Sequence, residues 1–320
     1  MTIPPRPLRV GIGPSSFAQE DKTPLRLLND AGVIVVPNPF SRRLTEDETI
    51  KYLVGEKLDG LLAGLEPLNR RVLAAARPKL RALARVGIGV TNVDLEACRN
   101  LGIKFSSTPD APSEAVAEMT LAALLCLARN LEPMNRAMHE GQWPKTISRS
   151  LRELKVLIVG YGRIGRGVAR QLALAGCEIL VCDPFLPAAA PCEFLRVELE
   201  AGLGQADVVS LHASGDRPLL GEREFALARD GLIILNSARG ELVDEAALVR
   251  ALESGRVGKA WFDAFWQEPY KGPLLQFKQV LLSPHASTYT RRCRLEMEVQ
   301  AAQNLLRDLG VALPSPEKKS

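Results

Sequence analysis

The sequence predicts an α/β protein built from two doubly wound parallel sheets of the Rossmann or flavodoxin-like kind. Short apolar runs rich in Val, Ile and Leu alternate with helical patterns along most of the chain. Such alternation is typical of parallel sheets that helices cover on both faces. The chain has 320 residues, with 46% hydrophobic and 24% charged residues, which suits a globular protein of two domains.

In the first third of the chain the pattern predicts strands that alternate with short helices. We expect strands at residues 8–12, 33–36, 60–63, 80–86 and 103–106, and helices at 24–31, 46–54, 68–76 and 92–100. A long apolar helix is expected at 113–129. Residues 136–150, around Trp143, are polar, and we interpret them as an irregular connecting or subunit-contacting arm.

The same alternation continues to the end of the chain. We expect strands at residues 155–159, 178–182, 208–211, 232–235, 260–263 and 280–282. Helices are expected between 164 and 175, near 222–228 and near 245–254, and residues 291–309 form an amphipathic helix.

The stretch from Lys155 to Asp183 carries the clearest functional signal. A buried strand leads directly into Gly160-Tyr161-Gly162-Arg163-Ile164-Gly165, a G-x-G-x-x-G sequence, which a helix and a second strand follow. In this arrangement the glycines allow a tight turn, the approach of a pyrophosphate and close packing of helix on strand. The phosphates would lie at the helix N-terminus, which favours anions. The alternative is a glycine-rich turn that binds no nucleotide.

Asp183 indicates which dinucleotide binds. Its carboxylate can accept hydrogen bonds from the ribose diol of adenosine, and its charge would repel a 2′-phosphate. The sequence therefore favours NAD over NADP as the cofactor. The alternative is that Asp183 is only a turn residue before Pro184.

Composition argues against several other function classes. The net charge is only +4, and the densest basic group, Arg291, Arg292 and Arg294, has no interleaved aromatic residues, so we expect no nucleic-acid partner. We favour a solvated helix face for these arginines, and the alternative is that they reach an anionic substrate. The six cysteines show no metal-ligand spacing and suit a reducing cytosol. No apolar run approaches the roughly 18 residues of a membrane span, and the start lacks a signal-peptide core. We therefore expect a cytoplasmic protein with no metal and no membrane partner.

Arg239, Glu268 and His285 form a candidate catalytic group. Each follows a predicted strand, and ligands bind at that edge of a parallel sheet. Hydride transfer to a ketone needs a proton donor, and a cation for a neighbouring carboxylate. A histidine beside a carboxylate favours the protonated form, and arginine binds an α-keto acid in a two-pronged way. The alternatives are a structural histidine and an arginine that caps a strand end.

These residues lie in stretches that resemble the D-isomer-specific 2-hydroxyacid dehydrogenases along essentially the whole chain. Several motifs in the same order make the resemblance specific. The matching stretches are GYGRIG with VCDP, SLH at Ser210–His212, LNSARGELVDEAALVRALESG at Leu235–Gly255, AWFDAFWQEP at Ala260–Pro269, LLSPHAST at Leu281–Thr288, RVGIGVTNVD at Arg85–Asp94 and EAVAEMT at Glu114–Thr120.

The resemblance implies roles for individual residues. It implies His285 as the general acid and base, Glu268 as the carboxylate partner that favours its protonated form, and Arg239 as the ligand of the substrate's carboxylate and carbonyl. Asp263 would contact the nicotinamide carboxamide. The backbone amides that would hold the substrate carboxylate belong to Val86, Gly87 and Ile88. The other implied cofactor-binding residues are Gly160, Gly162, Arg163, Ile164, Gly165, Asp183, His212 and Ala238; for His212 we favour a structural role.

We also expect one domain to be inserted into the other. The NAD-binding Rossmann domain would occupy residues 105–287, and residues 1–104 with 288–320 would form the substrate-binding domain. A cleft between two such domains is the expected active site. The resemblance further implies a homodimer formed through the nucleotide domain.

Several residues bear on the substrate's identity. Ser15 and Ser16, after the first strand, would contact the distal end of the substrate, although an ordinary loop explains them equally well. Gly64 stands where some phosphoglycerate dehydrogenases place a substrate arginine. Asp110-Ala111-Pro112 and Ala213-Ser214-Gly215 depart from the common family pattern near the cofactor.

We predict an NAD-dependent oxidoreductase that interconverts a 2-keto acid and a D-2-hydroxy acid. RVGIGVTNVD, the SSF of the first loop and YTRRCRLEME favour a phosphoglycerate dehydrogenase-like member with a small anionic substrate, in a chain too short for the regulatory domain that some carry. The alternatives are a glyoxylate or hydroxypyruvate reductase and a non-catalytic NAD(H)-sensing co-regulator. The sequence leaves open which acid is used, whether it carries phosphate or phosphonate, and in which direction the reaction runs.

Overall fold

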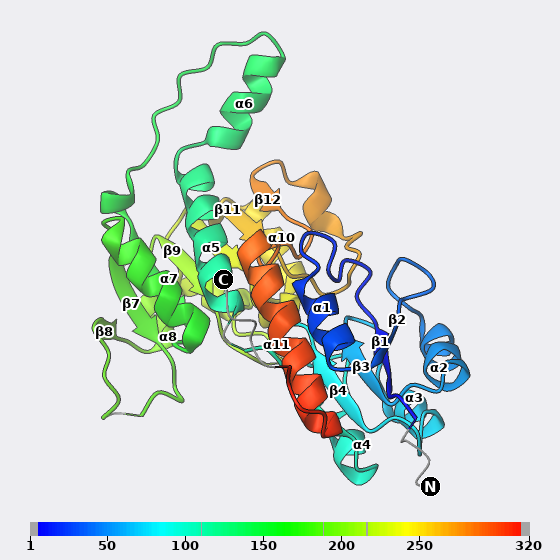
Figure 1. The fold of residues 1–320 in the computed structure, drawn as a ribbon. Helices are drawn as coiled ribbons and strands as arrows, with labels where there is room; N and C mark the ends of the chain where they lie inside the picture. The colour runs from blue at the N-terminus through cyan, green and yellow to red at the C-terminus, as the bar shows by residue number, and fades with distance from the viewer. Residues whose placement is uncertain (1–5, 110, 188, 216, 315–320) are drawn as a thin grey trace, which may run out of the picture. The chain divides into compact units, whose positions relative to one another are not determined.

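The computed structural model describes residues 6–109, 111–187, 189–215 and 217–314, and it contains two compact units (Figure 1). The terminal unit comprises Met1–Pro112 and Thr290–Ser320, and the central unit comprises Ser113–Tyr289. Each is built on one parallel sheet, of five strands in the terminal unit and seven in the central unit. The predicted class of two doubly wound parallel-sheet domains is confirmed.

The sheet of the terminal unit has the order β2-β1-β3-β4-β5. Its strands are β1 (Arg9–Ile12), β2 (Ile34–Val36), β3 (Gly60–Ala63), β4 (Ala82–Arg85) and β5 (Lys104–Ser106). This is the flavodoxin-like order, in which the direction of strand progression reverses between β1 and β3. The loops after these two strands therefore border the position where such sheets bind ligands.

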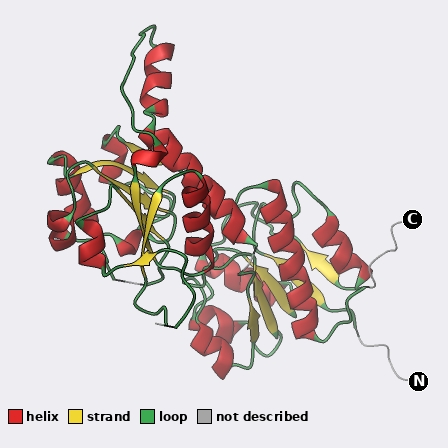
Figure 2. Ribbon diagram, turned by 90° about the vertical axis from the view of Figure 1, so that its left-hand side faces the viewer, coloured by secondary structure: helices red, strands yellow, loops and turns green. Residues whose placement is uncertain are grey.

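Helices cover both faces of this sheet (Figure 2). They are α1 (Thr23–Asp30), α2 (Glu46–Gly55), α3 (Arg70–Ala75), α4 (Leu95–Asn100) and α11 (Arg291–Leu309). The last helix packs on β3, β4 and β5 and against α1. On the opposite face Leu53, Leu73 and Ala97, one from each of the other three helices, form a core with Leu61 and Leu83 of the sheet. The C-terminal helix α11 thus completes the unit that the first residues of the chain begin.

Side-chain caps define where several of these helices begin. Thr45 accepts a hydrogen bond from the Glu48 amide and forms a capping box before α2. The side chains of Asn69 and Asp94 accept from the Val72 and Ala97 amides and cap α3 and α4, without a capping box. Each cap satisfies a backbone N–H that has no partner inside the helix.

The sheet of the central unit has the order β12-β11-β10-β9-β6-β7-β8. Its strands are β6 (Lys155–Val159), β7 (Glu178–Cys182), β8 (Leu195–Arg196), β9 (Val208–Leu211), β10 (Leu232–Asn236), β11 (Val257–Phe262) and β12 (Val280–Leu282). This is the Rossmann order with one further strand, and the order reverses between β6 and β9.

Both faces of the central sheet are buried. The helices are α5 (Pro112–Ala128), α7 (Arg163–Leu174), α8 (Leu199–Leu203), α9 (Glu222–Leu227) and α10 (Glu245–Glu253), with 3₁₀ turns at Leu151–Glu153, Gly240–Leu242 and Pro273–Gln276. Val156 and Ile158 of β6 join one core with α5 and α7, while Leu157 and Val159 join another with α8, α9 and α10. This explains why the strand is apolar at four consecutive positions, from Val156 to Val159, instead of alternating.

A helical arm extends from the central unit. Its helix α6 (Leu131–His139) has no buried residue, and the segment after it is extended (Figures 1 and 2). The prediction of irregular structure at 136–150 is therefore wrong for residues 136–139. The sequence contains no signal for this helix, because its apolar residues do not pack against a core. No described helix is both long and apolar enough to cross a bilayer.

We predict that Gly165→Ala destabilises the protein. A Cβ at residue 165 would lie 2.0 Å from the Gly160 carbonyl oxygen, so α7 would have to move away from the turn. We expect a loss of about 1–3 kcal/mol in the free energy of unfolding, measured in urea.

The matched control is Gly167→Ala in the same helix. A Cβ there would meet only ordinary contacts, the nearest being the Ala117 Cβ at 3.6 Å. The helix propensity of alanine should then stabilise the protein by about 0.5–1 kcal/mol. Equal effects of the two substitutions would contradict the close packing of α7 on the turn.

Candidate active site

The three motif glycines meet different surroundings. Gly160 has φ +91°, and a Cβ on it would lie 2.6 Å from the Ala213 amide nitrogen, in the loop after β9. Gly165 packs against the Gly160 carbonyl. No described atom lies within 4 Å of the Cβ position of Gly162. The first and third glycines therefore serve the fold, while the second leaves open space beside the turn.

The helix that follows begins without a side-chain cap. Gly162 is the N-cap residue of α7, and within the described residues no side-chain cap hydrogen bond forms at this helix end. Arg163 is exposed, and Ile164 packs against the core beneath. Exposed N–H groups at a helix N-terminus, beside a glycine with open space in front, fit the pyrophosphate of a dinucleotide.

Asp183 lies beside this turn, at the end of β7. Its Oδ2 accepts a hydrogen bond from the Tyr161 amide at 2.8 Å, and its Oδ1 accepts one from the Phe185 amide at 2.9 Å. Each carboxylate oxygen can accept a second hydrogen bond. The residue thus braces the turn and retains acceptor capacity for a ribose diol.

His212 lies on the other side of the strand-order reversal, at the end of β9. Its Nε2 is 2.7 Å from the Ser210 hydroxyl, and its backbone amide donates to the Val159 carbonyl. Burial lowers the pKa of His212 to about 3, so the ring is neutral at physiological pH. A neutral histidine that is hydrogen-bonded to Ser210 suits a structural role or contact with an uncharged group. It is less suited to donating a proton.

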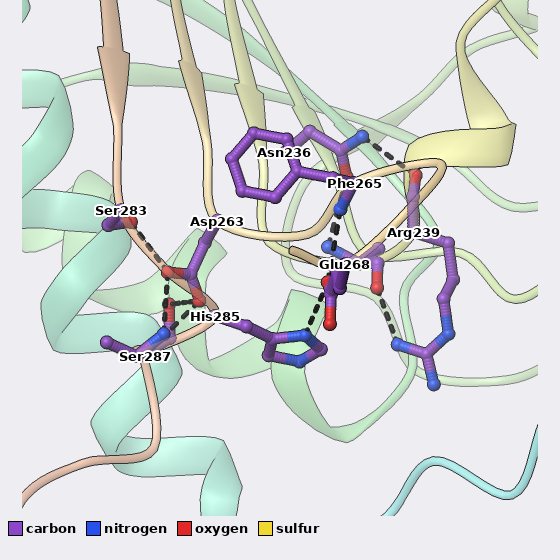
Figure 3. A network of polar contacts seen from close by, with 10 residues as sticks. Asn236, Arg239, Asp263, Phe265, Glu268, Ser283, His285 and Ser287 are labelled. Atoms are coloured by element: carbon purple, nitrogen blue, oxygen red, sulfur yellow. Dashed lines mark hydrogen bonds and ion pairs between the residues drawn. The ribbon is translucent and has the colours of Figure 1, made fainter. Parts of the chain in front are cut away.

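The structure brings Glu268 and His285 together at the carboxyl edge of the central sheet. His285 Nδ1 lies 2.8 Å from Glu268 Oε1 (Figure 3). Their side chains are 39% and 29% exposed, so solvent reaches both groups. His285 has φ +52°, and its amide donates to the Ser283 carbonyl. This tight turn directs the ring toward Glu268.

Glu268 is held in its ionised form. Burial alone would raise the pKa of its carboxyl, but the hydrogen bond and the charge of His285 oppose this effect. The Phe265 amide and the charge of Arg239 act in the same direction, and the net result is a lowered pKa. An ionised carboxylate can only accept hydrogen bonds, so His285 Nδ1 is the donor and Nε2 is left for a ligand.

Arg239 reaches the same edge from the end of β10. Gly240 makes this possible, because a Cβ there would lie 2.2 Å from the Trp266 amide nitrogen. The Asn236 side chain accepts from the Ala238 amide and donates to the Arg239 carbonyl, so it braces the turn. The guanidinium donates to the Ala238 carbonyl and extends away from the strand ends, as the His285 ring does (Figure 3).

Asp263 is almost fully buried and accepts four hydrogen bonds. The donors are the Ser283 hydroxyl, the Ala286 amide, and both the amide and the hydroxyl of Ser287. All four hold the turn that carries His285 (Figure 3). Its predicted contact with a nicotinamide stays a prediction, and its bracing role is an addition from the structure.

Sequence reasoning missed the polar residues that support this site. Asn236 is a buried polar residue at the end of β10, and Ser283 is a half-buried one directly after β12; a polar residue at a strand end was the available signal. Ser237 Oγ is buried and has no hydrogen-bond partner among the described residues. A buried hydroxyl between Asn236 and Arg239 fits a polar ligand at this edge.

In the terminal unit, two of the three predicted substrate amides donate within the chain. The Val86 amide donates to the Ala63 carbonyl, and the Gly87 amide donates to the Thr108 hydroxyl at 2.9 Å. Within the described part of the chain the Ile88 amide has no acceptor. The predicted contact of these three amides with a substrate carboxylate stays a prediction, and the Ile88 amide is the one that has its hydrogen free for a ligand among the described residues.

Arg85 holds this loop from beneath. It is 8% exposed, and its guanidinium donates to the Val86 and Gly89 carbonyls. Gly87 has φ +135°, and a Cβ there would lie 3.2 Å from Arg85 Nη1. The arginine and the glycine together set the conformation of the loop.

The other predicted substrate residues lie after β1 and β3. Ser15 is exposed, and Ser16 is partly buried beneath it. The carboxylate of the buried Glu66 occupies the space in front of Gly64, because a Cβ there would lie 2.8 Å from Glu66 Oε2. An arginine at residue 64 therefore has no room in this chain. Asp110, which we noted as a departure from the family pattern, lies outside the described residues.

Only part of the basic group on α11 is a solvated face. Arg291 and Arg292 are exposed, as predicted. Arg294 is only 14% exposed and pairs with the buried Glu298, so the prediction is wrong for this residue. The first turn of α11 packs against the loop after β1, which the helical pattern alone did not reveal.

The central unit matches a known family. A family model described as "D-isomer specific 2-hydroxyacid dehydrogenase, NAD binding domain" matches residues 121–287, which include the glycine turn, Arg239, Glu268 and His285. The chain belongs to this family. The predicted resemblance is confirmed, and NAD is the cofactor that the family's domain binds.

Curated relatives of this dehydrogenase family extend the match. D-3-phosphoglycerate dehydrogenase of Sus scrofa is 33% identical over 287 residues, which cover 86% of this chain and 53% of that protein. The chain spans about half the length of the phosphoglycerate dehydrogenases it matches. Hydroxypyruvate reductase of Thermotoga maritima is 30% identical over 281 residues, which cover 85% of this chain and 90% of that protein.

Solved structures of similar proteins have the same fold. The TT0316 protein from Thermus thermophilus has a TM-score of 0.85 and 31% identity, and the match covers 97% of this chain and 100% of that one. A glyoxylate reductase from Paecilomyes thermophila has a TM-score of 0.85 and 27% identity, and the match covers 98% of this chain and 100% of that one.

We predict that Glu268→Gln changes the pH dependence of catalysis. Glutamine keeps an acceptor for His285 but removes the negative charge that favours the imidazolium. Because the pKa of Glu268 is held below its usual range, the wild-type carboxylate is ionised near neutral pH, and the variant lacks this charge. We expect the pH above which reduction declines to fall by roughly one unit or more, measured as kcat against pH.

The control is Glu253→Gln, at the exposed end of α10 on the opposite edge of the sheet. It should leave the profile unchanged. If Glu268→Gln also left the profile unchanged, the carboxylate would only orient the ring.

Proposed function

We propose that the protein is an NAD-dependent D-2-hydroxyacid dehydrogenase that interconverts a 2-keto acid and a D-2-hydroxy acid. The observation that carries this proposal is the hydrogen bond of 2.8 Å between His285 and the ionised Glu268. Arg239 lies at the same strand edge. A proton donor, its carboxylate partner and a cation are the groups that reduction of an α-keto acid requires.

The chain's own residues have distinct tasks in this reaction. NADH, when bound, supplies the hydride. Arg239 holds the carboxylate and the carbonyl oxygen of the keto acid, and its charge stabilises the developing alkoxide. His285 donates the proton on Nε2 to that oxygen, because Nδ1 is engaged with Glu268. After the transfer His285 is neutral and Glu268 is still ionised. In the reverse reaction neutral His285 accepts the hydroxyl proton of the 2-hydroxy acid.

The substrate we propose is a small anionic 2-keto acid, as in a phosphoglycerate dehydrogenase-like enzyme. The names of the curated relatives support this class, and a hydroxypyruvate or glyoxylate reductase is the alternative that other relatives support. The Ile88 amide is the proposed contact for the substrate carboxylate. Ser15 and Ser16 are proposed contacts for its distal end.

We assign cofactor binding to residues 105–287, and substrate binding to residues 1–104 with 288–320. The proposed NAD contacts are Gly160, Gly162, Arg163, Ile164, Gly165, Asp183, His212, Ala238 and Asp263. The uncapped start of α7 and the acceptor capacity of Asp183 support this assignment.

We further propose a homodimer formed through the central unit. Leu131, Met138, Trp143 and Ile147 of the helical arm are large apolar residues exposed to solvent. A second copy of the chain that covers them would remove this surface from water. The cytoplasm is the location we propose, because all six cysteines are free thiols.

His285→Ala should lower kcat for keto acid reduction by roughly 10²–10⁴-fold, the usual loss when general acid catalysis is removed. NADH oxidation, followed by absorbance with a panel of 2-keto acids, measures both the activity and this loss. His139→Ala, on the arm, is the control. Wild-type protein that binds NADH but turns over none of the acids would support the non-catalytic alternative instead.

Replacing Asp183 with serine should raise the use of NADPH relative to NADH, because the charge that repels a 2′-phosphate is lost. The ratio of kcat/KM for the two cofactors measures the change. Asp230→Ser, an exposed change in the same unit, should leave the ratio as it is. An unchanged ratio in Asp183→Ser would count against the ribose assignment.

A further inference from the structure

The loop after β1 lies where the strand order of the terminal sheet reverses. Sheets of this order bind ligands beside the loops at that position. Ser15 and Ser16 are the first hydroxyl-bearing residues after the strand. The loop then turns back through Ala18, which has φ +54°.

A buried ion pair on α11 anchors this loop. Arg294 Nη2 lies 2.6 Å from Glu298 Oε1, and the two side chains are 14% and 5% exposed. Each partner also bonds the loop. Glu298 Oε2 accepts from the Ala18 amide at 2.8 Å, and Arg294 Nη2 donates to the Ser16 hydroxyl at 3.2 Å.

The same helix carries a second pair that is far more exposed. Arg292 and Glu296 have the same spacing in sequence and lie 2.8 Å apart, but they are 73% and 46% exposed. Exposed pairs of this kind contribute little to stability. Burying Arg294 and Glu298 costs desolvation free energy, which the hydrogen bonds to the loop help to offset.

The bond from Arg294 also determines what Ser16 can offer a ligand. A hydroxyl has one proton to donate, and here its oxygen already accepts from the guanidinium. The proton is then available to an acceptor oxygen. Because Glu298 compensates the charge of Arg294, the loop offers this hydrogen bond without a net positive charge from the pair.

We propose that Arg294 and Glu298 are positioning residues that hold Ser16 as a hydrogen-bond donor to the distal end of the substrate. This rests on the proposed function and narrows its substrate class to 2-keto acids with a hydroxyl or phosphate-ester oxygen beyond the keto acid group. A hydroxyl and a phosphate ester both present an oxygen that can accept a hydrogen bond. Hydroxypyruvate carries the first and 3-phosphohydroxypyruvate the second, so these acids are the two probes. Glyoxylate has no carbon 3 and serves as the reference.

The test compares kcat/KM for the three acids in each variant. Ser16→Ala and Arg294→Met should each lower kcat/KM for the preferred three-carbon acid about tenfold more than for glyoxylate, the scale of one lost hydrogen bond. The double variant should lose no more than the single ones, because both act through the same bond. Whichever three-carbon acid shows the effect identifies the oxygen.

Two further variants separate positioning from folding. Arg292→Met removes the exposed pair and should leave all three values unchanged. Arg294→Lys keeps a cation opposite Glu298 and should retain most of the selectivity, even if Arg294→Met folds poorly. Equal losses for all three acids in Ser16→Ala, or no loss for any, would overturn the inference. Wild-type protein that reduces none of the acids would instead contradict the proposed function on which it rests.

Discussion

The four hydrogen bonds to the buried Asp263 carboxylate are the constraint on which the candidate site depends. They come from residues on both sides of His285, so they set the backbone of its turn before any ligand arrives. A histidine with a positive φ is unusual, and such a conformation persists only where the surroundings hold it. The fixed turn therefore holds the His285 ring within hydrogen-bond distance of Glu268.

Backbone contacts at glycines bring the separate strand ends close together. Gly160 lies against the loop after β9, Gly165 lies against Gly160, and Gly240 lies against the backbone at Trp266. A Cβ at any of these positions would force the neighbouring backbone away. Glycine is needed at these positions because it lets two backbone segments approach closely, more than because it is flexible. Distant parts of the chain can therefore lie together at one edge of the sheet.

In the terminal unit, buried charged groups take the place of close backbone contacts. Arg85 holds the carbonyls of the loop after β4, Glu66 accepts from the Gly64 amide after β3, and Glu298 accepts from the Ala18 amide after β1. Burial raises the pKa of Glu66 and of Glu298, and the backbone amides that they accept from, together with the charges of nearby arginines, favour the ionised form. Charged side chains make stronger hydrogen bonds to backbone than neutral ones, which suits loops that have little regular structure of their own.

The sequence by itself determined most of the helices and strands and the types of residue in the candidate site. Apolar strands such as 155–159, the G-x-G-x-x-G turn, and the types of residue at 239, 268 and 285 express local patterns that one stretch of chain contains. Only the tertiary structure decided what those residues touch. It showed that Arg294 is buried, that residues 131–139 are helical without a core to face, and that Asp263 braces the turn of His285. The contacts of Arg294 and of Asp263 involve partners 278 residues and 20 to 24 residues away, and no local pattern records a distant partner.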